Sequence, residues 1–229
     1  MPFFYYDSTY ILVILALLLS AFASFGVNAT FSRYKKQINA RGFTGKDAAR
    51  KILDMNGLYN VRVEHVGGNL TDHFDPKSNV IRLSDSTYSD TSVAAIGVAA
   101  HEAGHAVQYA VNYAPLKIRN SIVPVVNLST QLSMPLFLIG LILGIYGLTT
   151  IGIILFSASL IFQLITLPVE FNASKRAISI LDSSGMLYDE ELKGAKKVLK
   201  AAALTYVAAV AASALQLLRL VLISGRRRN

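Results

Sequence analysis

Residues 101–105 read His-Glu-Ala-Gly-His, and this stretch decides the fold expected for the whole chain. On a helix, two histidines four residues apart lie on one face with Cβ atoms about 5 to 6 Å apart. Both imidazoles can then reach one metal ion at roughly 2.0 to 2.1 Å. The flanking residues 91–100 and 106–110 predict one smooth helix, which favours a metal site over the plain alternative, two histidines on an ordinary amphipathic helix.

Glu102 adds a base to this pair of histidines. Its carboxylate is expected to lean over the same metal and to take a proton from a zinc-bound water, as in HExxH metallopeptidases. The chain contains no cysteine, which excludes disulfides and thiolate zinc ligands. We therefore expect nitrogen and oxygen atoms to hold any metal.

Long uncharged stretches predict membrane-spanning helices. Residues 9–27 form an uncharged run long enough to cross about 30 Å of hydrocarbon. Residues 120–169 contain no acidic residue, basic residue or histidine, which predicts two further spans with a turn at 146–150. A final apolar stretch covers residues 201–223, near the C-terminus.

Basic residues predict the orientation of these spans. Residues 1–10 contain no Lys or Arg, whereas basic residues are frequent just after the first span, at Arg33, Lys35, Lys36, Arg41, Lys46, Arg50 and Lys51. This asymmetry places the N-terminus outside and residues 28–118 in the cytosol. The net charge of +8 suits cytosolic flanks that face anionic lipid, and no interleaving of basic and aromatic residues indicates a nucleic-acid partner.

A catalytic zinc usually takes three protein ligands and leaves a fourth position for water. The candidates for the third ligand are His65, His73 or a carboxylate. Glu170 stands out because it closes the uncharged stretch, where an acidic side chain is costly unless it has a partner. Two membrane crossings between His105 and Glu170 return the chain to the same side. The alternative, a carboxylate that merely marks the membrane border, stays open.

The segment before the zinc helix predicts one helix and two short strands. Residues 44–55 have a helical pattern opened by Thr44 and Asp47 and followed by Gly57. Residues 60–64 and 79–83 are typical of strands. A small sheet beside the zinc helix is suited to holding an extended peptide by strand addition.

Two residues between the predicted strands, His73 and Asp75, are candidates for lining that peptide cleft. Structural turn chemistry is the favoured role for both. Within the zinc helix, Gly104 costs about 1 kcal/mol relative to alanine. The simplest explanation is the close approach of another element, with the helix that carries Glu170 as the first candidate.

The C-terminal part predicts a last helix that starts near Asp189. Its small-sided first half, around residues 201–212, is suited to tight helix packing. We expect the first half to pack on the catalytic part and the leucine-rich end to enter the bilayer. One full crossing would place Arg226, Arg227 and Arg228 outside, against the charge rule, so a full span is left open.

The chain resembles the bacterial integral-membrane neutral zinc metallopeptidases, which are distantly similar to the HtpX and CAAX-prenyl membrane proteases. The resemblance covers nearly the whole chain, and it is carried by the HEAGHAVQ helix and by the segments at 70–76, 92–95, 113–116, 167–174 and 201–209. It implies that His101, His105 and Glu170 are zinc ligands and that Glu102 is the general base. One departure is Ser174, which stands where HtpX-like enzymes carry an Asp that orients a zinc histidine, so the surroundings of the ligands must differ here.

The expected fold class is an α+β zincin-like catalytic domain combined with transmembrane α-helices, mostly α with a small β-sheet. The expected parts are a transmembrane helix at 1–27, a cytosolic zincin-like part at 28–118, a transmembrane hairpin at 120–168, a cytosolic segment with the third zinc ligand at 169–200, and an apolar helix at 201–225.

The expected function is that of a membrane-bound zinc metalloendopeptidase of gluzincin-like type, which uses one Zn²⁺ to hydrolyse a peptide or membrane-protein substrate at the cytosolic face of a bacterial plasma membrane. The alternative is a non-proteolytic membrane scaffold or regulator with a structural zinc site, against which the intact Glu102 argues. The sequence does not determine the natural substrate, the group that stabilises the oxyanion, or the oligomeric state.

Overall fold

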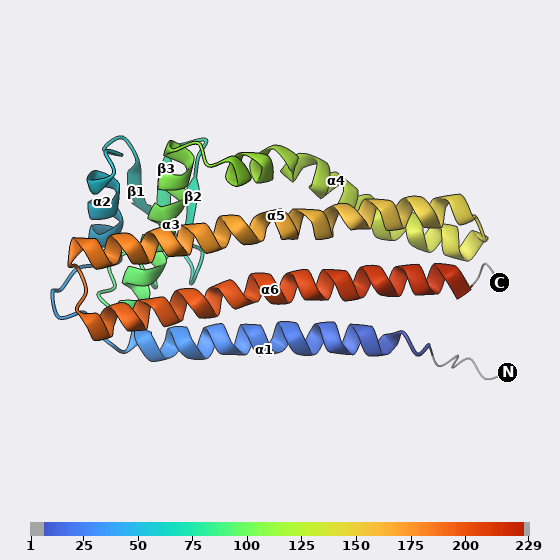
Figure 1. Ribbon diagram of the computed structural model, residues 1–229, viewed down its shortest axis with the longest axis horizontal. Coiled ribbons are helices and arrows are strands. Elements are labelled where there is room, and N and C mark those ends of the chain that lie inside the picture. The colour runs from blue at the N-terminus through green and yellow to red at the C-terminus, as the bar shows by residue number, and fades with distance from the viewer. Residues whose placement is uncertain (1–6, 227–229) are drawn as a thin grey trace. The chain divides into compact units, whose positions relative to one another are not determined.

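The computed structural model of the chain describes residues 7–226, and helices predominate in them (Figure 1). This part forms six helices and one three-stranded sheet, which confirms the expected mostly helical fold class with a small sheet. In chain order the elements are α1 (Tyr10–Lys35), α2 (Gly45–Met55), β1 (Arg62–His65), β2 (His73–Asp75), β3 (Val80–Leu83), α3 (Val93–Ala110), α4 (Ala114–Leu143), α5 (Tyr146–Ser184) and α6 (Asp189–Arg226).

The chain divides into two compact units. The first, here called the core unit, comprises Phe25–Lys117 and Pro168–Leu204. The second, here called the helical unit, comprises Met1–Ser24, Ile118–Leu167 and Thr205–Asn229. Four helices, α1, α4, α5 and α6, therefore contribute residues to both units, and each unit is described by itself below.

Helix α2 forms as the sequence predicts. Thr44 is its N-cap and accepts a hydrogen bond from the Asp47 backbone N–H, while the Asp47 carboxylate accepts one from the Thr44 backbone N–H. Such a capping box stabilises a helix by about 1 kcal/mol. The apolar face of α2 buries Ile52 and Leu53 completely in the core of this unit.

The sheet has the strand order β1-β3-β2, with β1 parallel and β2 antiparallel to the central strand β3. Two of its strands confirm the prediction from the sequence. The strand β2 was not predicted, because three residues are too few to show the alternation by which strands are recognised. It exists through its pairing with β3, in which Phe74 lies opposite Ile81.

Helix α3 is the central element of the core unit and confirms the predicted smooth helix. The side chain of Ser92 caps it by accepting a hydrogen bond from the Ala95 N–H at 3.2 Å. Its residues are almost continuously buried from Val93 to Gln108. A helix covered on all sides needs small residues, which explains its many alanines.

The first half of α6 packs against the core unit, as expected. The helix begins at Asp189 and buries Ala195, Val198 and Leu199 in the same core as α3. The Glu191 carboxylate fixes its start by accepting hydrogen bonds from the backbone N–H of Ala40 at 2.7 Å and of Tyr188 at 2.9 Å.

In the helical unit, α4 and α5 form a hairpin whose turn differs from the prediction. The predicted turn at 146–150 was wrong, because these residues form the start of α5. The chain turns at Gly144, which has a φ of 68°, a conformation that glycine adopts without strain. Thr149 lies in the contact between the two helices, since a Cβ on Gly140 would lie 2.5 Å from its backbone nitrogen, whereas a Cβ on Gly147 would meet nothing within 4 Å among the described residues.

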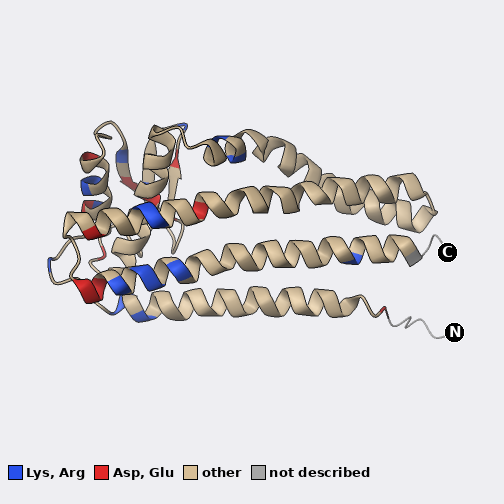
Figure 2. Cartoon of the chain, in the orientation of Figure 1, with Lys and Arg blue, Asp and Glu red and all other residues tan. Residues whose placement is uncertain are grey.

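Four helices are long and apolar enough to cross a membrane: α1, α4, α5 and α6. Figure 2 shows how few charged residues interrupt them. In α6 the charges gather in the first turns, up to Lys200, and after a long uncharged run only Arg219 follows before the last turn. Each of these helices therefore combines a charged end with an apolar stretch of membrane-spanning length.

Candidate metal centre

Helix α3 presents two histidines to one point, as the four-residue spacing requires. The rings of His101 and His105 have centroids 4.7 Å apart and stand nearly edge to face, with an interplanar angle of 82°. His105 is 9% exposed, and His101 is also largely covered. Both imidazoles are therefore held by packing.

Helix α5 reaches this point because Gly104 lets the two helices approach closely. A Cβ on Gly104 would lie 2.7 Å from the carbonyl oxygen of Ala173, well inside van der Waals contact. This confirms the expectation that the glycine admits the helix that carries Glu170. The close approach sets the distance between the histidines and the acidic side chain.

Glu170 lies between the two histidines. Its Oε2 atom is 3.2 Å from His101 Nε2 and 3.5 Å from His105 Nε2, and the residue is 3% exposed. One ligand atom from each of the three residues lies within 4.8 Å of the other two. Across residues 7–226, no second group of three or more such side chains comes together in this way.

The other ring nitrogen of each histidine has a hydrogen-bond partner. His101 Nδ1 is 3.1 Å from the Ser174 hydroxyl, and His105 Nδ1 is 2.9 Å from the Gln108 Oε1 atom. The amide oxygen of Gln108 can only accept, so Nδ1 of His105 carries a proton, and in the neutral imidazole Nε2 keeps its lone pair. Such partners orient metal-binding imidazoles and fix their tautomers.

Gln108 also joins the two helices to each other. Its Nε2 group donates to the Val169 carbonyl oxygen at 2.8 Å and to Asn172 Oδ1 at 3.0 Å, and the residue is fully buried. Three hydrogen bonds satisfy this buried amide, which would otherwise be costly to place there. The histidine on α3 and the backbone next to Glu170 are thus tied through one side chain.

Glu102 is largely buried beside this cluster, and its carboxylate is not held by any hydrogen bond or ion pair with residues 7–226. Its negative charge raises the pKa of His105. Burial lowers the pKa of His105, but the hydrogen bond to Glu170 and the charges of Glu102 and Glu170 outweigh burial, so this pKa is raised above its ordinary value. The site therefore attracts positive charge.

The donor set fits a zinc ion. Two imidazole nitrogens and a carboxylate oxygen around a tetrahedral zinc at 2.0 to 2.2 Å lie about 3.3 to 3.6 Å apart. The two distances from Glu170 Oε2 to the histidine Nε2 atoms, 3.2 and 3.5 Å, agree with this spacing. With the Nδ1 atoms already engaged, the Nε2 lone pairs face the position that an ion takes.

The sequence of residues 9–225 matches the family described as "Putative neutral zinc metallopeptidase". This chain belongs to that family. It is also 52% identical over 220 residues to the "Putative membrane protease YugP" of Bacillus subtilis (strain 168), a match that covers 95% of this chain and 98% of the relative. No solved structure matches the chain.

Membership of this zinc metallopeptidase family confirms the resemblance noted in the sequence and implies zinc as the metal. The name of the Bacillus relative says membrane protease, which agrees with the four apolar helices of this chain. The chain is thus a membrane protein of a zinc metallopeptidase family.

The structure does not bring His65 or His73 into the cluster. His65 Nε2 lies 2.6 Å from Asp85 Oδ1 at the end of β1, and His73 Nδ1 lies 2.8 Å from the Thr71 carbonyl oxygen. Asp75 accepts hydrogen bonds from the Lys77 N–H and from Ser78 and Arg82, which is the turn chemistry favoured from the sequence.

The contacts of three residues beside the cluster were not predicted from the sequence: those of Gln108, Asn172 and Ser174. A signal existed for two of them. Gln108 follows His105 by three residues and therefore lies on the same helix face. By the resemblance noted in the sequence, Ser174 stands where HtpX-like enzymes carry an Asp, and in the structure its hydroxyl lies against His101.

Proposed function

We propose that this chain is a zinc endopeptidase of gluzincin-like type in which His101, His105 and Glu170 hold one zinc ion. The convergence of the two Nε2 atoms on Glu170 Oε2, with both Nδ1 atoms already engaged, carries this proposal. The catalytic part then comprises residues 28–118 and 169–200, and the segments at 1–27, 120–168 and 201–225 anchor it in the bilayer.

Zinc, when bound, polarises the scissile carbonyl and makes a water acidic near neutral pH. The residues of the chain do the rest. Glu102 lies in α3 between the proposed ligands His101 and His105, and its carboxylate is free to accept the proton of the attacking water. The same carboxylate then gives this proton to the leaving amine, so that one residue serves as base and as acid.

The sheet offers a place for an extended peptide. Strand β2 lies at one edge of the sheet, and α3 packs against it. Phe74 on β2 and Tyr109 on α3 have ring centroids 5.9 Å apart, which fixes this edge beside the zinc helix. A peptide that adds as a further strand gains backbone hydrogen bonds whatever its sequence, so we propose an extended peptide or an unfolded segment of a membrane protein as substrate.

We propose that the catalytic part faces the cytosol of a bacterial plasma membrane and that the N-terminus lies outside. The basic residues from the end of α1 through α2 support this orientation. Topology tags give the test: a tag at residue 1 and one at the turn at Gly144 should report outside, while tags near Lys36 and Asp182 should report the cytosol. Tags at the turn and near Asp182 on the same side would overturn the orientation.

The substitution Glu102→Gln tests the peptidase mechanism. It removes the base without removing a ligand, so hydrolysis should fall by about 10²-fold or more while zinc content stays that of the wild type. Purified protein, an unbiased peptide library and metal analysis provide the measurements. Hydrolysis by the variant at the wild-type rate would favour the alternative, a membrane scaffold with a structural zinc site, since such a site gains nothing from a base.

A further inference from the structure

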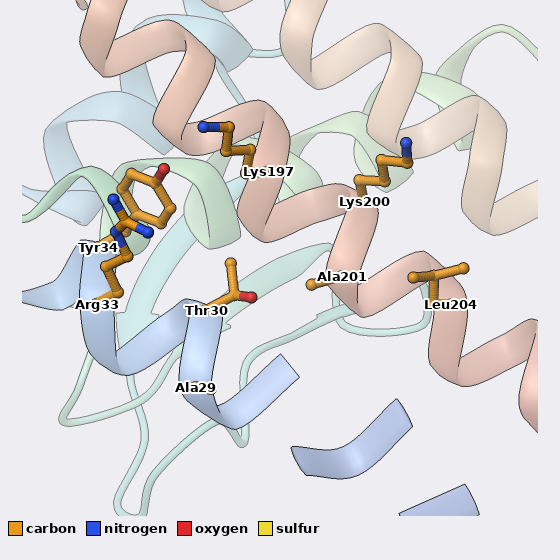
Figure 3. Close-up of a pocket in the computed structure, with 8 residues that line it drawn as sticks. All are labelled: Ala29, Thr30, Arg33, Tyr34, Lys197, Lys200, Ala201 and Leu204. Atoms are coloured by element: carbon orange, nitrogen blue, oxygen red, sulfur yellow. The ribbon is translucent and has the colours of Figure 1, made fainter. Parts of the chain in front are cut away.

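A basic cleft lies in the core unit between the end of α1 and the first half of α6. Figure 3 shows the side chains that line it. Its volume is about 380 Å³. The side chains that matter below are Thr30, Arg33 and Tyr34 from α1, and Lys197, Lys200 and Leu204 from α6. The cleft is separate from the metal centre, which is built on α3 and α5.

The cleft is lined by positively charged side chains. Arg33, Lys197 and Lys200 are exposed, and none of them forms an ion pair with another residue in the range 7–226. An adjoining cavity of about 490 Å³ shares Arg33 and Lys197 and contains one acidic side chain, Glu190, which is already paired with Lys193 at 2.7 Å. The chemistry of the cleft therefore suits an anion.

One wall of the cleft is fixed in place. Tyr34 is 8% exposed, and its ring packs where a Cβ on Gly194 would lie only 2.8 Å away. The guanidinium carbon of Arg33 lies 5.7 Å from the centroid of that ring. The Arg33 charge thus lies beside the buried ring of Tyr34, which is held in the close contact between α1 and α6.

The cleft changes from charged to apolar in one direction. On α1, the lining residues on the N-terminal side of Arg33 are Thr30 and Ala29, and the helix carries no charge from there to its first residue. Forward along α6, Lys200 is followed by Ala201 and Leu204 in the lining, and no charge occurs until Arg219. The two helices run antiparallel here, so both become apolar on the same side of the cleft.

We propose that this cleft binds the phosphate headgroup of an anionic phospholipid, with Arg33, Lys197 and Lys200 around the phosphate and the acyl chains along the apolar stretches of α1 and α6. Basic pockets between membrane helices at the headgroup level bind such lipids. A soluble phosphate matches the three cations but leaves the apolar side of the cleft unused. The proposal goes beyond peptide hydrolysis and does not depend on it.

Lipid in the cleft bridges α1 and α6 next to the core. Ala195, six residues before Ala201 on α6, packs against Gly97 of α3, where a Cβ would be 3.5 Å from the Ala195 Cβ. Binding that holds α1 to α6 therefore stabilises the unit that contains α3. We expect phosphatidylglycerol to raise the thermal unfolding temperature of the full chain and phosphatidylcholine to do so much less.

The test compares two double variants of the full-length protein that each lose one charge from α1 and one from α6. Arg33→Gln/Lys197→Gln removes two charges of the cleft, whereas Lys35→Gln/Lys196→Gln removes two exposed charges that line neither cavity. Binding of phosphatidylglycerol and phosphatidylcholine is titrated in detergent by native mass spectrometry, together with free inorganic phosphate.

Wild type and the Lys35/Lys196 variant should bind phosphatidylglycerol in preference to phosphatidylcholine, and the Arg33/Lys197 variant should bind phosphatidylglycerol roughly 10- to 30-fold more weakly. All the substituted side chains are exposed, so the folded state should persist in both variants. Equal weakening in both variants, or equal binding of the two lipids by wild type, overturns the proposal. Free phosphate that binds as tightly as the lipid overturns the assignment to a lipid.

Discussion

The core unit holds two pairs of histidines in two different surroundings. His101 and His105 are largely buried on α3, each with a partner at Nδ1, and their Nε2 atoms converge on one carboxylate. His65 and His73 lie exposed on the sheet, and their side chains are hydrogen-bonded to Asp85 and to the Thr71 carbonyl, respectively. The two sheet histidines have no common acceptor.

The difference teaches that histidine spacing alone does not make a metal centre. Four residues of separation place two imidazoles on one face, but Glu170 comes from a second helix packed at close range, and the Nδ1 partners come from both helices, Gln108 on α3 and Ser174 on α5. In this chain Gly104 allows that packing, and Ser174 and Gln108 occupy the nitrogens that face away from the ion. Helix α2 packs against β1 and α3 against β2, but among residues 7–226 neither helix brings His65 or His73 into a group of three donors.

The largest effect is expected from removing the shared acceptor. Glu170→Ala should lower zinc affinity by more than the 10- to 100-fold typical of a residue that only supports a ligand, and hydrolysis should be lost with the metal. Metal analysis after dialysis against a graded chelator measures the affinity. His65→Ala and His73→Ala, each without a part in the cluster, should keep the zinc content of the wild type.

Zinc content that survives Glu170→Ala and collapses in a sheet-histidine variant would reverse the comparison. The site would then be a three-histidine one, and Glu170 would mark only the membrane border. Because Glu170 is buried between two imidazoles, Glu170→Gln provides a variant of nearly equal volume that separates loss of ligation from loss of packing.

The next effect concerns the helix contact itself. Gly104→Ala adds a methyl group 2.7 Å from the Ala173 carbonyl oxygen, so α5 must move away from α3. We expect a loss of about 1 to 3 kcal/mol in the free energy of unfolding, together with weaker zinc binding. Gly97→Ala on the same helix is the matched control: its methyl group meets Ala195 at an ordinary 3.5 Å, and it should be neutral or should gain up to about 1 kcal/mol.

Thermal unfolding in detergent, with and without chelator, measures both glycine variants. Equal destabilisation by the two substitutions would show that helix flexibility, rather than the α3–α5 approach, is what these glycines provide.

A smaller effect is expected at the partner of His101. Ser174→Ala removes the hydroxyl 3.1 Å from His101 Nδ1 and should weaken zinc binding by about 10- to 100-fold while the fold is kept. Ser183→Ala, on an exposed face of the same helix, is the control. Competition with a fluorescent zinc chelator resolves such a difference, and identical affinities for both variants would remove Ser174 from the metal centre.

The smallest effect belongs to the sheet and depends on pH. Hydrogen bonds from Ser78, Arg82 and the Lys77 N–H hold the pKa of Asp75 well below its usual range. A depressed pKa adds stability that is complete above the unfolded value of about 3.9 and is lost as the pH falls toward the folded value. Asp75→Asn should therefore flatten the acid-side decline of the unfolding temperature below about pH 4 without changing zinc content at neutral pH. An unchanged decline would show that Asp75 adds no such stability.

Local features of the fold could be predicted from the sequence because local chemistry specifies them. The capping box at Thr44, the small-residue helix around His101 and the start of α6 at Asp189 each follow from residues within a few positions. Strand β2 could not be predicted, since its three residues take their conformation from pairing with β3. The turn of the helix hairpin was placed too late because residues 146–150, with one glycine and two threonines, are typical of a turn in sequence although they begin α5.

The candidate site could likewise be predicted from the sequence only in part. The sequence points to His101, Glu102, His105 and Glu170 through motif and charge pattern, and the structure brings the two histidines and Glu170 together, while their binding of zinc stays a prediction. The contacts of Gln108 with Val169 and Asn172 depend on how α5 lies against α3. Nothing within a short window of sequence specifies that arrangement, so a buried glutamine gives no signal by itself.

Because the ribosome makes these helices in chain order, the residues of the proposed metal centre are not all made at the same time. Helix α3 emerges with both histidines and Glu102, but Glu170 follows only after the whole of α4 and much of α5. At about 5 to 20 residues per second, the growing chain remains without its third ligand for several seconds. During that time it exposes a base and two imidazoles but no closed site. The proposed metal centre can therefore close only after α4 and the part of α5 up to Glu170 have been made.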